Sequence, residues 1–442
     1  MTPYRSSKAA WQRIRQNAAL MTAGGTWSEQ LPKDIRDNLR WFFFDGFFAS
    51  AGDAITVTYI PLFILALGAT STQIGLMASL ASLSATLLLL PGAILADRLG
   101  KRKLIVLLGG GGITRLTLPL LALTPLLFAG PSAVYIAIAL KVTADAFANL
   151  SLPAWTSMTG DVVPLAWRGR YFSARNIMMG ISNMVSILLV GQLITHTHAP
   201  VGYQLALMVA FIVGSVSTYS YARIREPNKP AIPQDLRSYS PAGLLASLRA
   251  DSNFATFCLY NAFWNFSMNL AGPFFTIYLV QDLHATAAMV GVTSLVASLT
   301  GLPAQRWFGQ LSDRWGPRRV QLLTGLLIPI LPISWVFTTN VWHTIPIQIG
   351  SGILWGGFNL ASFNFLLALT PPEHRARFTA LNQIAIAFAS AIGAAIGGVI
   401  AGQFGYHAVF ILSGIGRFLA MLVFIRFVRQ PQPAVAMVKQ EI

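Results

Sequence analysis

Charged residues are scarce in this chain, since 10% of its 442 residues are Asp, Glu, Lys or Arg, whereas 54% are hydrophobic. Cysteine is nearly absent, because Cys258 is the only one, and a single cysteine forms neither an intrachain disulfide nor a cysteine metal site. The sequence also lacks a nucleotide-binding loop, a cluster of metal ligands and a nucleophile constellation. These absences argue against a soluble multidomain enzyme and against ATP-driven machinery, and we expect no cofactor and no bound metal.

Long apolar segments are what the chain has in abundance. A helix needs roughly 20 apolar residues to cross a bilayer, and twelve segments of that length or longer follow one another with short connections. We therefore predict an all-α integral membrane protein. Its twelve transmembrane helices are expected at residues 38–67, 71–95, 103–129, 132–162, 170–195, 201–222, 252–281, 286–311, 319–339, 342–369, 377–401 and 406–428.

The net charge of +16 is distributed as a topology signal and not as a patch for nucleic acid. Lys and Arg occupy both ends of the chain and every second connection, including residues 98–103 and 168–175. The intervening connections, near residues 70, 130, 198, 284, 340 and 405, contain none. By the positive-inside rule, both termini face the cytoplasm of a bacterial inner membrane, and nucleic acid is not an expected partner.

The chain is expected to consist of two halves joined by a polar linker that contains four prolines. The basic N-terminal segment lacks a cleavable signal peptide, and it forms either an amphipathic surface helix or a disordered tail. The predicted parts are a cytoplasmic N-terminal segment at 1–37, a six-helix bundle at 38–224, a cytoplasmic linker at 225–250, a second six-helix bundle at 251–429 and a cytoplasmic tail at 430–442.

An internal repeat supports the two halves. The stretch Ala93 to Lys103, AILADRLGKRK, recurs 216 positions later as Gly309 to Arg319, GQLSDRWGPRR, and the apolar segments before both stretches align without a gap. Repeats of this kind are typical of secondary transporters. Both copies resemble the loop signature of the major facilitator superfamily, G-x-L-x-D-R-x-G-R/K-R/K, although Ala93 replaces the first glycine in the first copy.

The resemblance implies two pseudo-symmetric six-helix bundles around a central cavity lined mainly by spans 1, 4, 7 and 10. It also implies that the acids and bases of the signature loops, with those of a second loop pair at 161–176 and 371–378, close the cytoplasmic side. The candidate residues for this conformational gate are Asp97, Arg98, Arg102, Arg168, Arg170, Asp313, Arg314, Arg318 and Arg375.

Titratable residues at membrane depth are the candidates for proton coupling, because a carboxylate in hydrocarbon is costly unless it faces a partner or a wet cavity. Asp45 and Asp53 lie about 12 Å apart along the first span and near one face of it. Lys141, Asp145 and Asn149 form one stripe of the fourth span. We expect Asp53 to carry the proton, with Lys141 and Asp145 setting its affinity; a purely structural ion pair is the alternative.

The second half carries amides where the first half carries acids. Asn261 and Asn269 align with Asp45 and Asp53 at the 216-residue offset, and Asn265 lies between them. Uncharged amides suit the hydroxyls, carbonyls or amides of a solute, although hydrogen bonds between helices explain them too. The predicted substrate-binding residues are Asn261, Trp264, Asn265, Asn269, Trp355, Asn359 and Asn149.

Two further arginines lie inside the spans. Arg115 is expected to pair with a carboxylate on a neighbouring helix, whereas Arg417 has no evident partner in the sequence. The fifth span lacks the Gly-Pro pair of proton-driven drug exporters, which counts against a typical drug antiporter. The combined expectation is a monomeric secondary transporter that moves a small organic solute by alternating access with proton coupling. An uncoupled facilitator, a proton-driven drug exporter and a transporter-like receptor without flux remain alternatives.

Overall fold

The structure, a computed structural model, describes residue 22 and residues 26–164, 167–197, 199–226, 251–369 and 375–429. Within these residues every regular element is helical. The chain divides into two compact units: unit 1 is Met1–Gly68 with Leu87–Pro233, and unit 2 is Ala69–Thr86 with Gln234–Ile442. The expected amphipathic N-terminal helix, most of the expected linker and the expected C-terminal tail lie outside the described residues, so the five-part division remains a prediction.

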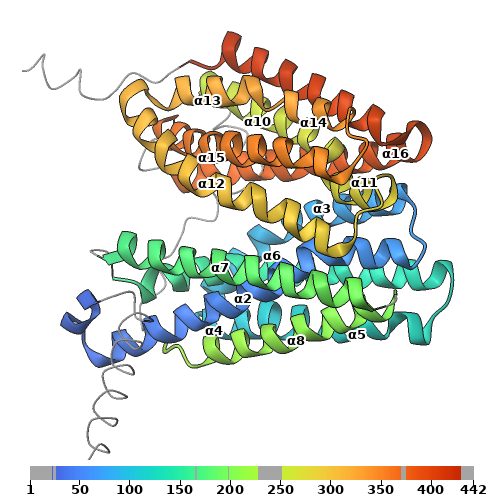
Figure 1. The fold of residues 1–442 in the computed structure, drawn as a ribbon. Coiled ribbons are helices and arrows are strands. Elements are labelled where there is room, and N and C mark those ends of the chain that lie inside the picture. The colour runs from blue at the N-terminus through green and yellow to red at the C-terminus, as the bar shows by residue number, and fades with distance from the viewer. Residues whose placement is uncertain are drawn as a thin grey trace, which may run out of the picture. The chain divides into compact units, whose positions relative to one another are not determined.

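Unit 1 is built on α2, which packs against α7 and α8, while α5 packs against α6 and α8 (Figure 1). A core cluster that includes Leu39, Phe42, Tyr171 and Ile224 holds the ends of these helices together. Its elements are η1 (Thr26–Gln30), α2 (Lys33–Ala66), the second half of α3 (Ser71–Leu99), α4 (Arg102–Val106), η2 (Leu107–Ile113), α5 (Thr114–Leu127), α6 (Pro131–Val162), α7 (Arg168–His196) and α8 (Val201–Ala222).

The four consecutive glycines of unit 1, Gly109 to Gly112, form a π-helical turn, η2, inside the third span. A Cβ atom on Gly109 would lie 2.1 Å from the hydroxyl of Ser151 on α6, and one on Gly111 would lie 2.7 Å from Thr218 on α8. Glycine therefore lets both neighbouring helices approach this turn closely. The close helix contact predicted from the glycine run is confirmed.

Unit 2 is held by the packing of α10 on α16 and of α12 on α15 (Figure 1). Large aromatic side chains, among them Phe254, Tyr260, Phe365 and Phe424, fill its core. Its elements are the first half of α3, α10 (Ser252–Ala271), η5 (Gly272–Phe274), α11 (Phe275–Gln281), α12 (Ala287–Trp315), α13 (Pro317–Leu327), α14 (Ile330–Trp335), η6 (Val341–His343), α15 (Thr344–Leu369) and α16 (Arg375–Phe427).

Small residues of α16 allow it to pack closely in unit 2. A Cβ atom on Gly393 would lie 2.3 Å from the carbonyl oxygen of Phe266, and one on Gly397 would lie 2.2 Å from that of Leu270, both on α10. Gly398 faces Gly75 of α3, where an added Cβ would meet the Gly75 Cα at 2.9 Å. The prediction that these glycines mark close helix packing is confirmed.

The helix bounds agree with the predicted spans to within a few residues, but four spans differ in form. The expected seventh span is a pair of helices joined by the 3-10 turn η5, and the expected ninth span is divided between α13 and α14. The last two spans are two helical segments that follow each other directly within α16, and their 53 residues amount to about 80 Å of helix at 1.5 Å per residue. Because a bilayer core is about 30 Å thick, α16 must cross twice, and it turns at Gly405, whose φ is 80°.

Among the described residues, eight helices are by themselves long and apolar enough to cross a membrane. The expected spans outside this group are the two that are interrupted, at 252–281 and 319–339, and the tenth, at 342–369. The eight are Lys33–Ala66, Ser71–Ala96, Arg102–Leu127, Pro131–Val162, Arg170–His196, Val201–Ala222, Ala287–Trp315 and Leu381–Phe427.

Candidate functional site

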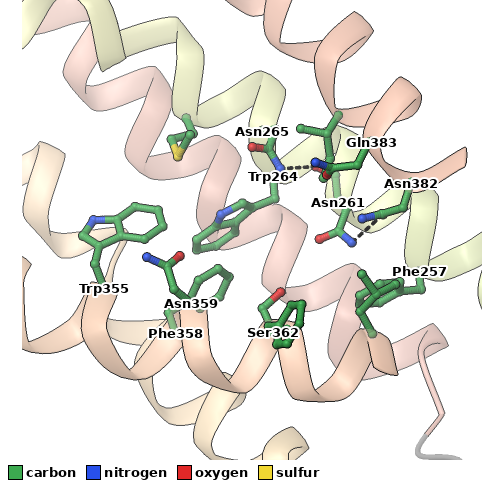
Figure 2. Close-up of a pocket in the computed structure, with 14 residues that line it drawn as sticks. Phe257, Asn261, Trp264, Asn265, Trp355, Phe358, Asn359, Ser362, Asn382 and Gln383 are labelled. Carbon is green, nitrogen blue, oxygen red and sulfur yellow. Dashed lines mark hydrogen bonds between the residues drawn. The ribbon is translucent and has the colours of Figure 1, made fainter. Parts of the chain in front are cut away.

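Unit 2 contains a cavity of about 260 Å³ between α10, α15 and α16 (Figure 2). Five of the residues predicted to bind a solute line it, namely Asn261, Trp264, Asn265, Trp355 and Asn359. They come together because the four-residue spacing of Asn261 and Asn265 places both on one face of α10, and that face packs toward α15 and α16. No charged residue is among those that line this cavity in the described part of the chain.

Aromatic rings form one wall of the unit 2 cavity. The indole of Trp264 is only 2% exposed and stacks on Phe358, with ring centroids 4.7 Å apart. Trp355 meets Trp264 edge to face at 6.2 Å and Phe358 at 5.5 Å. Such mutually packed rings offer a rigid apolar surface for a planar solute, and stacking adds about 0.5–1.5 kcal/mol per ring pair beyond the burial of area.

Amide side chains form the opposite part of the cavity. Asn261 donates to the Oδ1 atom of Asn382 at 2.8 Å, and Asn265 donates to the backbone carbonyl of Asn261 at 2.9 Å. Figure 2 shows the amide of Asn359 between Trp355 and Trp264. Asn359 has no hydrogen-bond partner within the described residues, so its donor and acceptor are available to a solute.

Asn269, the remaining amide of the predicted α10 stripe, lies away from this cavity. It donates to the carbonyl of Asn265 at 2.9 Å and to the hydroxyl of Ser390 at 3.0 Å. These contacts connect α10 to α16, which is the helix-to-helix role considered as the alternative for the stripe. Asn382 and Gln383 line the cavity but were not predicted, because they lie in the first turns of a span whose interior has few polar residues.

Unit 1 contains a second cavity, of about 340 Å³, which is lined by Asp45 and Asp53 of α2 among other residues. Asp45 is buried; it accepts a hydrogen bond from Ser217 at 2.8 Å and pairs with Arg175 at 3.6 Å. The Arg175 Nε atom also donates to the carbonyl of Phe42 at 3.1 Å, and the guanidinium lies 4.2 Å from the Phe42 ring centroid. Asp45 is therefore enclosed by partners.

Arg175 is the main correction in unit 1. The sequence interpretation counted it among the basic residues of a cytoplasmic loop, but α7 begins at Arg168, so Arg175 lies two turns inside the helix and is 4% exposed. Arg175 can be buried because the carboxylate of Asp45 supplies the opposite charge and because Gly46 leaves space for the guanidinium. A Cβ atom on Gly46 would lie 2.4 Å from the Arg175 guanidinium carbon.

Asp53 lies in a different environment from Asp45. Its side chain is 63% exposed and pairs with Arg115 of α5 at 3.3 Å. The prediction that Arg115 pairs with a carboxylate on another helix is confirmed. The Arg115 side chain lies against Gly214 of α8, and its Nε atom is buried without a hydrogen-bond partner within the described residues. Most of the Asp53 side chain is thus accessible, and its ion-pair partner is Arg115.

The predicted stripe of α6 forms its own contact. Lys141 and Asp145 pair with each other along the helix. Asn149 lies on the same helix but is not among the residues that line the unit 1 cavity. The predicted titratable residues thus form two separate ion pairs, Asp53 with Arg115 and Lys141 with Asp145.

The predicted gate residues occupy the ends of helices. Arg102 pairs with Asp161 at 2.8 Å and with Glu226 at 3.3 Å, and the backbone N–H of Arg102 donates to Glu226 as well. Arg168 donates to the carbonyls of Val163 and Gly160, and Arg170 lies over the Trp167 ring. Glu226 was not predicted, because it belongs to the polar segment interpreted as a linker.

Among the other predicted gate residues, the structure describes hydrogen bonds for Arg318. Arg318 donates to the carbonyls of Ile425 and Val428, both at 3.3 Å. Arg98, Asp313 and Arg314 are exposed. Asp97 and Arg375 lie in α3 and α16, and their side chains lie outside the described part of the structure.

Comparison with known proteins identifies relatives along most of the chain. The family profile described as Major Facilitator Superfamily matches residues 42–268 and 257–441. The multi-drug resistance efflux pump PmrA of Streptococcus pneumoniae is 26% identical over 394 residues, which cover 86% of this chain and 93% of that protein. The multidrug resistance protein MdtG of Dickeya zeae is 27% identical over 169 residues, 37% of this chain and 41% of that protein.

Solved structures with a similar fold are more distant in sequence. The nucleoside transporter NupG superimposes with a TM-score of 0.67 at 13% identity, covering 90% of this chain and 100% of that one. A bacterial homologue of the iron transporter ferroportin, in an inward-facing state, gives a TM-score of 0.68 at 15% identity, covering 89% and 99%. At these identities the similarity concerns the fold alone.

Proposed function

Because the chain belongs to the major facilitator superfamily, and is therefore a multi-pass membrane transporter and not an enzyme, we propose that it exports small, uncharged aromatic solutes in exchange for protons. The observation that carries this proposal is the unit 2 cavity, in which packed indoles meet uncharged amides. The direction is proposed from the similarity to PmrA, which is an efflux pump.

The unit 2 cavity favours a solute with a flat apolar body and a few polar atoms. Trp264 and Trp355 supply the apolar surface, and Asn265 and Asn359 supply donors and acceptors without charge. A formal charge on the solute would have to leave water without a counter-ion in this cavity, which is costly. Loss of one amide contact should weaken binding by about 0.5–1.5 kcal/mol, or roughly two- to tenfold.

For the proton, Asp53 is a better candidate than Asp45, the other acid of α2 that lines the unit 1 cavity. Its side chain is 63% exposed, so a proton can reach it from the cavity, whereas Asp45 is enclosed by Arg175 and Ser217. Arg115 is the counter-ion of Asp53. Separation of this pair during the transport cycle would let the carboxylate exchange a proton with the cavity, which gives a route to couple proton movement to transport. Lys141 and Asp145 remain candidates for tuning this step.

The finer aspects of topology belong to the same proposal. We propose a bacterial plasma membrane location with both termini in the cytoplasm, a monomer, and no nucleic acid partner. The predicted gate residues would then close the cytoplasmic side. Arg102 supports this role best, because one guanidinium connects Asp161 at the end of α6 to Glu226 after α8.

The test uses purified protein in proteoliposomes that contain a pH-sensitive dye. A panel of uncharged aromatic compounds, each with a charged analogue, is added under a proton gradient, and both solute efflux and lumenal pH are followed. We expect Asp53→Asn to abolish solute-driven pH change while the dissociation constant stays within about threefold. Asn265→Ala should do the reverse. Asp282→Asn is the matched control, because this exposed acid directly follows α11, outside both cavities and the predicted gate.

Undiminished proton flux in Asp53→Asn would contradict the coupling assignment. An uncoupled facilitator is the second candidate. The Asp53–Arg115 pair favours it if the pair stays intact throughout transport, because Asp53 would then be structural and would carry no proton. It predicts flux down the solute gradient in either direction with no pH change. Binding without any flux would instead identify a transporter-like receptor.

A further inference from the structure

A second cavity of unit 2, of about 180 Å³, contains a buried cation that the proposed transport does not use. Residues of α11, α12, α14, α15 and α16 enclose it. Its lining includes Thr276, Trp335, Gln348, Ser351, Trp355 and Arg417. Trp355 also lines the amide-bearing cavity, so its indole is a wall common to both.

Arg417 is the unusual member of this lining. Its residue surface is 3% exposed, and its Nε atom is buried with no hydrogen-bond partner. Within the described residues no carboxylate pairs with it and no group accepts a hydrogen bond from it. Twelve residues of helix separate it from the turn at Gly405, about 18 Å along the axis, so it lies near the middle of the span. A cation at this depth is costly without a counter-charge.

The neutral groups around Arg417 are also unsatisfied. Thr276, Gln348 and Ser351 carry hydroxyl or amide donors, and none of the three has a hydrogen-bond partner within the described residues. The described acids of unit 2 lie near helix ends, at Asp251, Asp282 and Asp313. One guanidinium and three neutral polar side chains therefore surround an enclosed space with a net charge of +1 and unused hydrogen-bond donors.

We propose that this cavity binds one monoanionic group, with Arg417 as its counter-ion and Gln348, Ser351 and Thr276 as additional donors. The charge of a single guanidinium matches a carboxylate or a halide and not a dianion such as phosphate. A carboxylate would be held by two parallel N–H bonds from the planar guanidinium. The anion is either a halide from inorganic salt or the carboxylate of an organic acid, and both carry a single negative charge. The proposal is independent of the proposed transport, because binding is measured without flux.

The experiment measures thermal unfolding of purified protein in detergent, with sodium sulfate at constant concentration as the bulk salt, because sulfate is a dianion that a single guanidinium does not match. Sodium benzoate, sodium acetate and sodium chloride are each titrated, and benzamide is the neutral counterpart of benzoate. Three variants are compared with the natural protein: Arg417→Met removes the charge with little change in shape, Arg417→Lys keeps a cation, and Arg306→Gln removes an exposed cation of α12 as a matched control.

We expect at least one anion to raise the unfolding temperature in a saturable manner, and benzamide to have no such effect. Arg417→Met should weaken that response about 10- to 100-fold in midpoint concentration, as for loss of a charged hydrogen bond. Arg417→Lys should retain part of it, and Arg306→Gln all of it. Response to benzoate alone assigns the site to organic acids, and a response to chloride alone assigns it to halides.

The proteins without added monoanion provide a second readout. If Arg417 is an unpaired buried charge, then Arg417→Met should unfold at a higher temperature than the natural protein in sulfate alone. A lower unfolding temperature would mean that Arg417 has a partner within the protein, and it would overturn the proposal. Equal responses to benzoate and benzamide, or an anion response that survives in Arg417→Met, would overturn it as well.

Discussion

Disrupting the Asp45–Arg175 pair should destabilise unit 1 far more than its single 3.6 Å contact suggests. The two side chains are 8% and 5% exposed, so water cannot replace a lost partner. Removing one partner of a buried pair costs about 3–5 kcal/mol, because the other charge stays buried and unpaired. We therefore expect Asp45→Asn and Arg175→Met each to lower the unfolding temperature by roughly 6–20 °C, using about 2–4 °C per kcal/mol for a unit of this size.

The double variant separates coupling from independent effects. Asp45→Leu combined with Arg175→Met removes both charges, and such apolar replacements of buried pairs are often close to neutral. A residual cost of about 1 kcal/mol is expected, because the carbonyl of Phe42 loses the Arg175 Nε donor. Thermal unfolding of the natural protein, Asp45→Leu, Arg175→Met and the double variant forms a double-mutant cycle. Additive losses, in which the double variant costs the sum of the two singles, would refute the coupling.

A glycine provides an independent route to the same pair. The Cβ atom introduced by Gly46→Ala would lie 2.4 Å from the Arg175 guanidinium carbon, so the guanidinium must move away from Asp45. We expect a loss of stability comparable to that of Arg175→Met. Gly180→Ala on α7 is the control, since its Cβ would meet no atom within 4 Å. If both alanine variants behave alike, the close approach of Gly46 to Arg175 does not stabilise the unit.

Three further outcomes are expected. Gly352→Ala should reduce the yield of folded protein, because its Cβ atom would lie 2.1 Å from the Thr300 hydroxyl at the α12–α15 contact. Gly309→Ala should leave the yield unchanged, because its Cβ atom would lie 3.4 Å from a leucine methyl group. Size-exclusion chromatography of detergent extracts compares the two yields. Trp264→Ala should lower the free energy of unfolding by about 3–5 kcal/mol, because this indole is 2% exposed and stacks on Phe358. Asn359→Ala is therefore the variant in which equilibrium binding measures solute affinity without loss of the aromatic packing. Arg102→Gln should make a single cysteine introduced beside the signature loop of unit 1 several-fold more reactive toward a water-soluble maleimide, since both of its ion pairs are lost; unchanged labelling would argue against a gate role.

The sequence alone predicted the helices well, because the length of an apolar run and the positions of its polar ends are local properties. The spans were predicted to within a few residues, and the four-residue spacing of Asn261 and Asn265 correctly placed both amides on one face of α10. The difference between the two signature loops also has a local explanation. Gly309 has room for a Cβ atom, so the sequence can carry Ala93 at the corresponding position of the other half.

Only the tertiary structure decided which polar groups meet. The turn of 100° per residue determines the face of a helix on which a side chain lies, but the packing of helices determines what that face contacts. For this reason the spacing of residues along α2 did not reveal that Asp53 pairs with Arg115, and Asn269 contacts Ser390 instead of the cavity.

Arg175 shows the physical basis of this difference most directly. In the sequence it is one more basic residue beside a loop, because a cation near a helix end normally reaches water. In the structure the Gly46 position leaves space for its guanidinium and Asp45 provides the opposite charge, and both come from a helix more than 120 residues earlier in the chain. Burial of this cation depends on a non-local partner and on non-local space, and neither is encoded in the spacing of residues along α7.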